Sequence, residues 1–252
     1  MDNTVKEPLI HLSKREDMSF GKKWLVRIIA ILLSLIVCAG FIFIIIKMNP
    51  VEVYEGIVEG AVGTGRRFWV TARDALTLLC VAVAVTPAFK MKFWNIGAEG
   101  QILMGCVASA AMMIYAGNAL PTGLLLVLMF VCSFIAGGIW GIIPAFFKAR
   151  WNTNETLFTL MLNYVAMQVV TFCIVYWENP AGSNSVGIIN APTRAGWLPQ
   201  LFGLDYGWNL AIVLLLTVLM FIYMKRTKHG YEIAVVGESE NTARYAGINV
   251  GK

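Results

Sequence analysis

The chain contains long apolar runs without a single charged side chain, and these runs limit its fold more than any other feature. The first run, 28–46, is 19 residues long, close to the ~20 residues that a helix needs to cross a bilayer. Inside lipid every backbone N–H and C=O must be paired within the protein, which a helix achieves within one segment. The sequence therefore predicts an all-α membrane protein, a polytopic helical bundle with about six transmembrane segments. These segments are 28–46, 75–89, 102–116, 124–147, 156–177 and 210–224.

Composition and the scarcity of catalytic residue types exclude several classes of protein. Charged residues make up 14% of the chain, against about 25% in a typical soluble domain, so the polar surface of a soluble protein is missing. The five cysteines lie inside apolar runs without a C-x-x-C spacing, and both histidines lie in charged flanks. Such a sequence predicts no metal ion, no cofactor and no histidine-based catalytic centre.

Basic residues lie at the ends of the apolar runs, and this arrangement predicts the orientation of the chain. Cytoplasmic segments of membrane proteins carry an excess of Lys and Arg. Counting from a cytoplasmic N-terminus places Lys90, Lys92, Lys148, Arg150 and the basic cluster at 225–228 on the cytoplasmic side. The same scatter over the ends of runs, without a basic stripe, predicts no nucleic-acid partner.

The predicted organisation has three parts. A cytoplasmic tail is expected at 1–23, a transmembrane domain at 24–224 and a cytoplasmic segment at 225–252. Two interpretations of residues 47–74 stay open: an amphipathic helix along the outer membrane surface, or a solvated loop.

A polar, glycine-containing segment at 94–101, Trp-Asn-Ile-Gly-Ala-Glu-Gly-Gln, separates the short runs 75–89 and 102–116. Ionisable residues at membrane depth mark transport pathways, and short or broken hydrophobic segments indicate a transport site. We therefore expect the substrate pathway to be lined by polar side chains of this segment and of the 156–177 span, namely Asn95, Glu99, Gln101 and Asn163.

The role of Glu99 has three interpretations. Its carboxylate can accept hydrogen bonds from a solute, or it can pair with Lys90 or Lys92. It can also stabilise the positive end of a helix that starts near Gln101.

The tail 230–252 contains the pattern of a short helix. Glu238 and Glu240 precede Arg244, which suits the helix dipole. Ser239 or Asn241 can cap its start, and a glycine at 247 suits a left-handed end. This tail is interpreted either as a compact helix that inserts into a groove on a partner, or as a frayed connector.

Three stretches of the chain resemble permease subunits of ATP-binding-cassette importers, over roughly residues 70–252. Residues 93–101 are similar to the Phe-Asn-Ile-Gly-Ala-Glu-Gly-Gln signature of the nucleoside and simple-sugar subgroup, with Trp94 as an additional residue. Asn154-Glu155-Thr156 with 159–164 resembles the second conserved block of that subgroup. Gly237, Ala243 and 246–248 resemble the cytoplasmic loop that couples the permease to its ATPase. This family also includes ribose and branched-chain amino-acid permeases.

The resemblance implies a transmembrane permease subunit that translocates nucleosides or simple sugars across a bacterial plasma membrane. ATP hydrolysis is expected on a separate ATP-binding subunit, because the chain has no Walker A sequence. The other expected partners are a second permease subunit, in a homo- or heterodimer, and an extracytoplasmic solute-binding lipoprotein that contacts the loop 178–208. The implied ATPase-coupling residues are Gly237, Glu238, Ala243, Ala246 and Gly247.

Related permeases continue past the coupling loop with further helices, so this chain is expected to lack the C-terminal part of the family fold. Two other functions remain as alternatives. One is an ion-coupled secondary transporter with Glu99 as the carrier, and the other, disfavoured by the absence of catalytic constellations, is a membrane-embedded enzyme.

Overall fold

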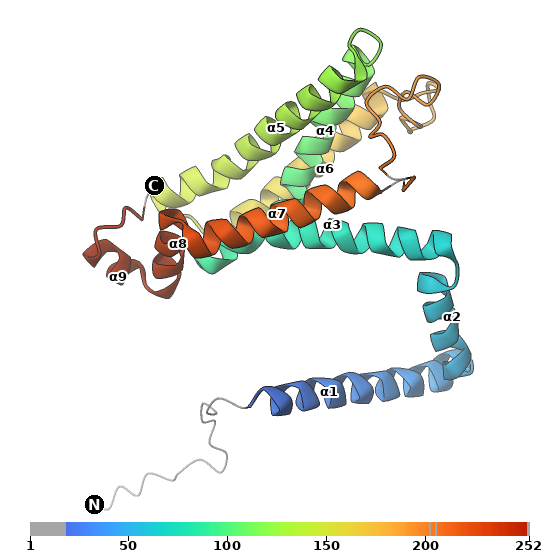
Figure 1. The fold of residues 1–252 in the computed structure, drawn as a ribbon, viewed down its shortest axis with the longest axis vertical. Helices are drawn as coiled ribbons and strands as arrows, with labels where there is room; N and C mark the ends of the chain where they lie inside the picture. Colours follow the sequence, from blue (N-terminus) through green and yellow to red (C-terminus); the bar gives the residue numbers. More distant parts are fainter. Residues whose placement is uncertain (1–18, 202, 205, 251–252) are drawn as a thin grey trace, which may run out of the picture. The chain divides into compact units, whose positions relative to one another are not determined.

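The computed structural model describes residues 19–201, 203–204 and 206–250 (Figure 1). Most of the predicted tail at 1–23 therefore lies outside the described residues. The chain divides into two compact units, Met1–Phe68 and Trp69–Lys252. The helices are α1 (Phe20–Phe41), which continues as the π-helix η1 (Ile42–Ile46), α2 (Pro50–Val62), α3 (Gly65–Lys90), α4 (Ala98–Ala116), α5 (Thr122–Trp151), α6 (Glu155–Tyr176), α7 (Gly207–Arg226), α8 (Lys228–Glu238) and α9 (Glu240–Tyr245). No strand forms within these described ranges.

Among the described residues, six helices are long and apolar enough to cross a membrane: α1 with η1, α3, α4, α5, α6 and α7. The predicted fold class, an all-α polytopic bundle with about six membrane segments, is confirmed. These helices leave large apolar side chains uncovered over most of their length. A helix that is apolar all round and uncovered by protein is typical of a lipid-facing span.

The segment 47–74 is helical rather than a loop. Pro50 takes the first position of α2, where its missing N–H costs nothing, and the side chain of Asn49 accepts a hydrogen bond from the Val51 amide at 3.1 Å. The next helix, α3, already begins at Gly65 and runs for 26 residues. The expectation of a short second span at 75–89 is therefore wrong. The hydropathy of the sequence identified only the apolar part of α3. Arg66, Arg67 and Arg73 belong to the same helix but lie before its apolar run.

In the second unit, α4 packs against α5 and α6 and forms the core (Figure 1). Small residues let α4 and α5 approach closely: a Cβ on Gly105 would lie 3.4 Å from the Ser133 carbonyl oxygen. Ser133 also hydrogen-bonds Ser109 and donates to the Gly105 carbonyl at 3.0 Å. Pro144 lies within α5 without ending it.

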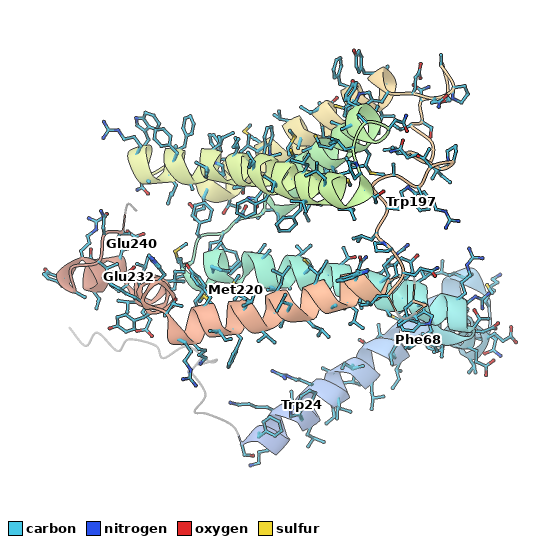
Figure 2. All side chains as sticks on the ribbon, turned by 45° about the horizontal axis from the view of Figure 1, so that its top comes forward. Trp24, Phe68, Trp197, Met220, Glu232 and Glu240 are labelled. Carbon is cyan, nitrogen blue, oxygen red and sulfur yellow. The ribbon has the colours of Figure 1, made fainter. Side chains whose placement is uncertain are left out.

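The loop between α6 and α7 is fastened to one end of this core. The Asn190 Nδ2 atom donates to the carbonyls of Met113, at 2.8 Å, and Ala195, at 3.1 Å. The indole N–H of Trp177 donates to the Tyr115 hydroxyl at 2.8 Å. Figure 2 shows Trp197 of this loop at one end of the second unit, with Glu232 of α8 and Glu240 of α9 at the other.

Candidate functional site

The segment 91–97 is an irregular break between α3 and α4, and local hydrogen bonds hold its shape. Lys92 has a φ of 60°, which turns the chain back. The amide of Phe93 donates to the Ala88 carbonyl at 2.9 Å. The side-chain Oδ1 of Asn95 accepts from the Gly97 amide at 2.9 Å, so this predicted pathway residue serves the break itself.

Two buried side chains of α6 hold the break from the other side. The Oδ1 atom of Asn163 accepts from the Gly100 amide at 2.9 Å, and its Nδ2 donates to the Ile96 carbonyl at 3.0 Å. The Thr159 hydroxyl accepts from the Ile96 amide at 3.2 Å. Thr159 is 0% exposed and Asn163 3%. Backbone groups that no longer belong to a regular helix thus find partners away from lipid, as irregular backbone in a membrane requires.

The glycines of the segment allow this close packing. A Cβ on Gly97 would lie 2.9 Å from the Cβ of Thr159, and one on Gly100 would lie 2.8 Å from Asn163 Oδ1. A Cβ on Gly100 would also lie 3.0 Å from the indole nitrogen of Trp140, a buried N–H without a hydrogen-bond partner. Both positions therefore have room for a hydrogen atom only, which is a packing reason for glycine.

An ion pair joins α5 to α6 at the end of the bundle that holds the break. Lys148, near the end of α5, contacts Glu155, the first residue of α6, with 2.9 Å between Nζ and Oε2. The backbone amide of Trp94 lies close to the same carboxylate. Glu155, Thr159 and Asn163 follow at intervals of four, which places them on one helix face. All three contact the break.

Thr159 and Glu155 are contacts of the break that we did not select from the sequence. Both lay in a stretch already matched to the second conserved block. The spacing of four residues from Glu155 to Thr159 and from Thr159 to Asn163 was the signal that could have identified them.

The four predicted pathway residues are not equivalent in the structure. Backbone groups bind the Oδ1 atom of Asn95 and both polar atoms of the Asn163 amide. The amide of Gln101 packs against α5, because a Cβ on Gly141 would lie 3.0 Å from its Nε2. Glu99 lies in the first turn of α4 and is exposed. No ion pair joins Glu99 to Lys90 or Lys92 in the described part of the chain. A role of these four side chains in solute passage stays a prediction.

The predicted short helix of the tail is α9, and Ser239 caps it. The Ser239 hydroxyl accepts from the Thr242 amide at 3.3 Å. Gly247 has a φ of +74°, and the following Ile248 amide donates to the Ala243 carbonyl at 3.0 Å, as in a left-handed helix end. The expectations for both ends of this helix are confirmed. The preceding helix α8 was not predicted.

The five predicted coupling residues fall into two groups. Gly237 and Ala243 are buried within the chain, whereas Glu238, Ala246 and Gly247 are exposed. Only the exposed group is free to contact another subunit. The neighbouring Tyr245, with 94% of its surface exposed, is a further accessible side chain that we did not select.

No group of three or more metal-ligating side chains occurs among the described residues. The candidate site has three parts at one end of the bundle. They are the hydrogen-bonded break between α3 and α4, the exposed carboxylate of Glu99 beside it, and the two helices α8 and α9.

Comparison with known proteins gives consistent matches. A guanosine ABC transporter permease protein of Bacillus subtilis, NupP, is 29% identical over 90% of this chain and 65% of its own length. A nucleoside ABC transporter permease protein of Lactococcus lactis, NupB, is 29% identical over 90% of this chain and 64% of its own length. A glucose ABC transporter permease protein of Haloferax volcanii, TsgB13, is 28% identical over 86% of this chain and 59% of its own length.

The match thus spans about 59–65% of the length of these relatives. No solved structure matches the chain significantly. The family model described as "Branched-chain amino acid transport system / permease component" matches residues 69–252, which is the whole second unit. The chain belongs to this family of transport permease components, and the resemblance inferred from residues 93–101 is confirmed.

Proposed function

We propose that the chain is the membrane-spanning subunit of an ATP-driven importer for nucleosides or related simple sugars. The observation that carries this proposal is the α3–α4 break, whose polar backbone is paired by Asn163 and Thr159 inside an apolar bundle. Broken membrane helices of this kind build solute sites in transporters. The printed names of the relatives, which include guanosine, nucleoside and glucose permeases, support this class of solute.

Within this proposal, Glu99 is the predicted pathway residue that contacts the solute. It is exposed beside the break, and its carboxylate can accept hydrogen bonds from ribose hydroxyls. Asn95 and Asn163 act by fixing the backbone around Glu99, since the Oδ1 of Asn95 and both polar atoms of Asn163 bind backbone groups. The side-chain amide of Gln101 packs against α5 at Gly141, and this contact orients the start of α4.

The partners in this proposal are a separate ATP-binding subunit, a second permease subunit in a homo- or heterodimer and an extracytoplasmic solute-binding lipoprotein. The protein is placed in a plasma membrane with residues 1–23 and 225–252 cytoplasmic and 24–224 in the membrane. Clustering of basic residues supports this orientation, because Lys92 reaches Glu238 and Lys148 reaches Glu155 at the same end as the break. The loop predicted at 178–208, which in the structure ends where α7 begins at Gly207, is the proposed contact for the solute-binding protein.

The test is uptake of radiolabelled guanosine, uridine and ribose by cells that contain or lack the gene for this chain. We expect the gene to increase uptake of at least one of these solutes, and ATP depletion by arsenate to abolish that increase. Uptake that survives ATP depletion but is lost with a protonophore would contradict the proposal and favour an ion-coupled transporter.

A variant of Glu99 tests its role separately. We expect Glu99→Gln to reduce uptake at least tenfold at unchanged protein level, because a neutral amide is a weaker acceptor than a carboxylate. Glu55→Gln, which removes an exposed carboxylate from α2, is the matched control and should transport normally. Normal uptake by Glu99→Gln would remove Glu99 from the pathway.

A further inference from the structure

The two glycines of α8 lie on one face of the helix and contact two other helices. Gly230 and Gly237 are seven residues apart, almost two full turns, so they share a face. Both are buried. A Cβ on Gly230 would overlap the carbonyl oxygens of Tyr223 and Met224 at the end of α7. A Cβ on Gly237 would overlap the carbonyl oxygen of Lys90, the last residue of α3.

A second contact joins α8 to the same place. The ammonium group of Lys92 donates to the Glu238 carbonyl at 3.4 Å. Glu238 is the last residue of α8, where unpaired carbonyls and the negative end of the helix dipole favour a cation. The end of α8 is therefore held against residues 90–92 by backbone packing and by a charge-assisted hydrogen bond.

Lys90 directly precedes the break, and Lys92 lies within it. From there, the Trp94 amide contacts Glu155, and the backbone of Ile96 binds Thr159 and Asn163. The end of α8 thus contacts the break directly, and hydrogen bonds connect the break to α6. By contrast, the exposed face of α9, marked by Tyr245, makes none of these contacts and is free for another subunit.

We infer that Gly237 is a positioning residue, which seats the segment α8–α9 on the end of α3 so that movement of this segment is delivered to the break. This inference rests on the proposed function, because it assumes an ATP-binding subunit that moves α9. It differs from the expectation for Gly237 taken from the sequence, since a buried glycine packed on Lys90 contacts its own chain and not the ATPase.

The experiment compares Gly237→Ala with the wild-type chain in the complete transporter, purified with its ATP-binding subunit and reconstituted in liposomes with the solute-binding protein. We expect Gly237→Ala to lower uptake at least tenfold while the ATP-binding subunit still co-purifies and basal ATP hydrolysis persists. Gly138→Ala is the matched control, because a Cβ there meets no atom within 4 Å, and it should transport normally. Loss of co-purification would overturn the inference by making Gly237 a docking residue, and a wild-type ratio of solute transported to ATP hydrolysed would overturn it as well.

A second pair of variants covers the case in which Gly237→Ala does not accumulate. Lys92→Gln removes the cation that holds the Glu238 carbonyl without adding volume, and we expect a several-fold fall in transport per ATP that Lys92→Arg restores. Unchanged coupling in Lys92→Gln would overturn the inference. Absence of ATP-dependent uptake by the wild-type complex is a different result, because it contradicts the proposed function and not the contact of α8 with α3.

Discussion

At the scale of single residues, Asn163 shows how one side chain can stabilise an interrupted membrane helix. Its amide carries both a donor and an acceptor, and the break presents one backbone group of each kind, the Gly100 N–H and the Ile96 carbonyl. The sequence identified Asn163 as a polar residue in a membrane span and predicted a role in solute passage. That prediction could not include its partners, because the pairing depends on residues 63 and 67 positions away.

Replacement of Asn163 by Ala should destabilise the folded protein by about 1–3 kcal/mol, because an N–H and a carbonyl lose their partners in an apolar core. The free energy of unfolding, measured by titration of purified protein with sodium dodecyl sulfate in mixed micelles, checks this value. Gln168→Ala is the control on the same helix, since Gln168 is exposed, and it should change stability by less than about 0.5 kcal/mol. Equal effects of the two variants would contradict the bridging role of Asn163.

Gly100 gives a second prediction at this scale. A Cβ at this position would lie 2.8 Å from Asn163 Oδ1, so Gly100→Ala should separate α4 from α6 and lower stability by about 1–3 kcal/mol, as overpacking does. Gly123→Ala, at a position with open space around it, serves as the comparison in thermal unfolding of the solubilised protein. A melting temperature for Gly100→Ala equal to that of Gly123→Ala would show that the α4–α6 contact is looser than described.

At the scale of elements, apolar runs predicted the existence of all six membrane helices but not the extent of α3 or the presence of α8. The first turns of α3 carry Arg66 and Arg67, and hydropathy cannot distinguish a polar helix end from a loop. Gly230 and Gly237 each make a helix less favourable by about 1 kcal/mol than alanine would. The sequence therefore did not predict α8. Close packing against α7 and α3, where only glycine fits, accounts for both residues.

The cap of α9 is the element that sequence reasoning described best, with Ser239 and Asn241 as alternatives. The structure assigns the cap to Ser239. Ser239→Ala should therefore weaken α9 by about 1 kcal/mol, which hydrogen–deuterium exchange of residues 240–246 would report as a roughly fivefold faster exchange. Asn241→Ala should leave exchange nearly unchanged, and the reverse order of the two variants would assign the cap to Asn241.

At the scale of the whole second unit, the two ends of the bundle differ in chemistry. One end gathers Lys92, Lys148 and the break, and the other holds the loop with Trp177 and Asn190. The sequence predicted that Lys92 and Lys148 lie on one side of the membrane, and both lie at one end of the bundle. Arg73 lies at the other end, over the Tyr206 ring, and the sidedness of the two ends stays a prediction. The fastening of the loop to α4 could not be predicted, because Asn190 and Met113 lie 77 positions apart.

The proposed orientation predicts which positions are accessible from outside the cell. In a background without the five native cysteines, Ala181→Cys should react with a membrane-impermeant maleimide in intact cells. Tyr245→Cys should react only after the membrane is permeabilised. Both positions are exposed, so a lack of labelling reports sidedness and not burial. Labelling of Tyr245→Cys in intact cells would reverse the orientation.

Apart from the bond from Lys92 to the Glu238 carbonyl of α8, the hydrogen bonds described for the α3–α4 break come from residues 87–163. The geometry of the break is therefore encoded mainly in one contiguous stretch of the chain, with one further hydrogen bond to α8. Recombination between related permeases at the flanks of this stretch would transfer an intact break into a new background.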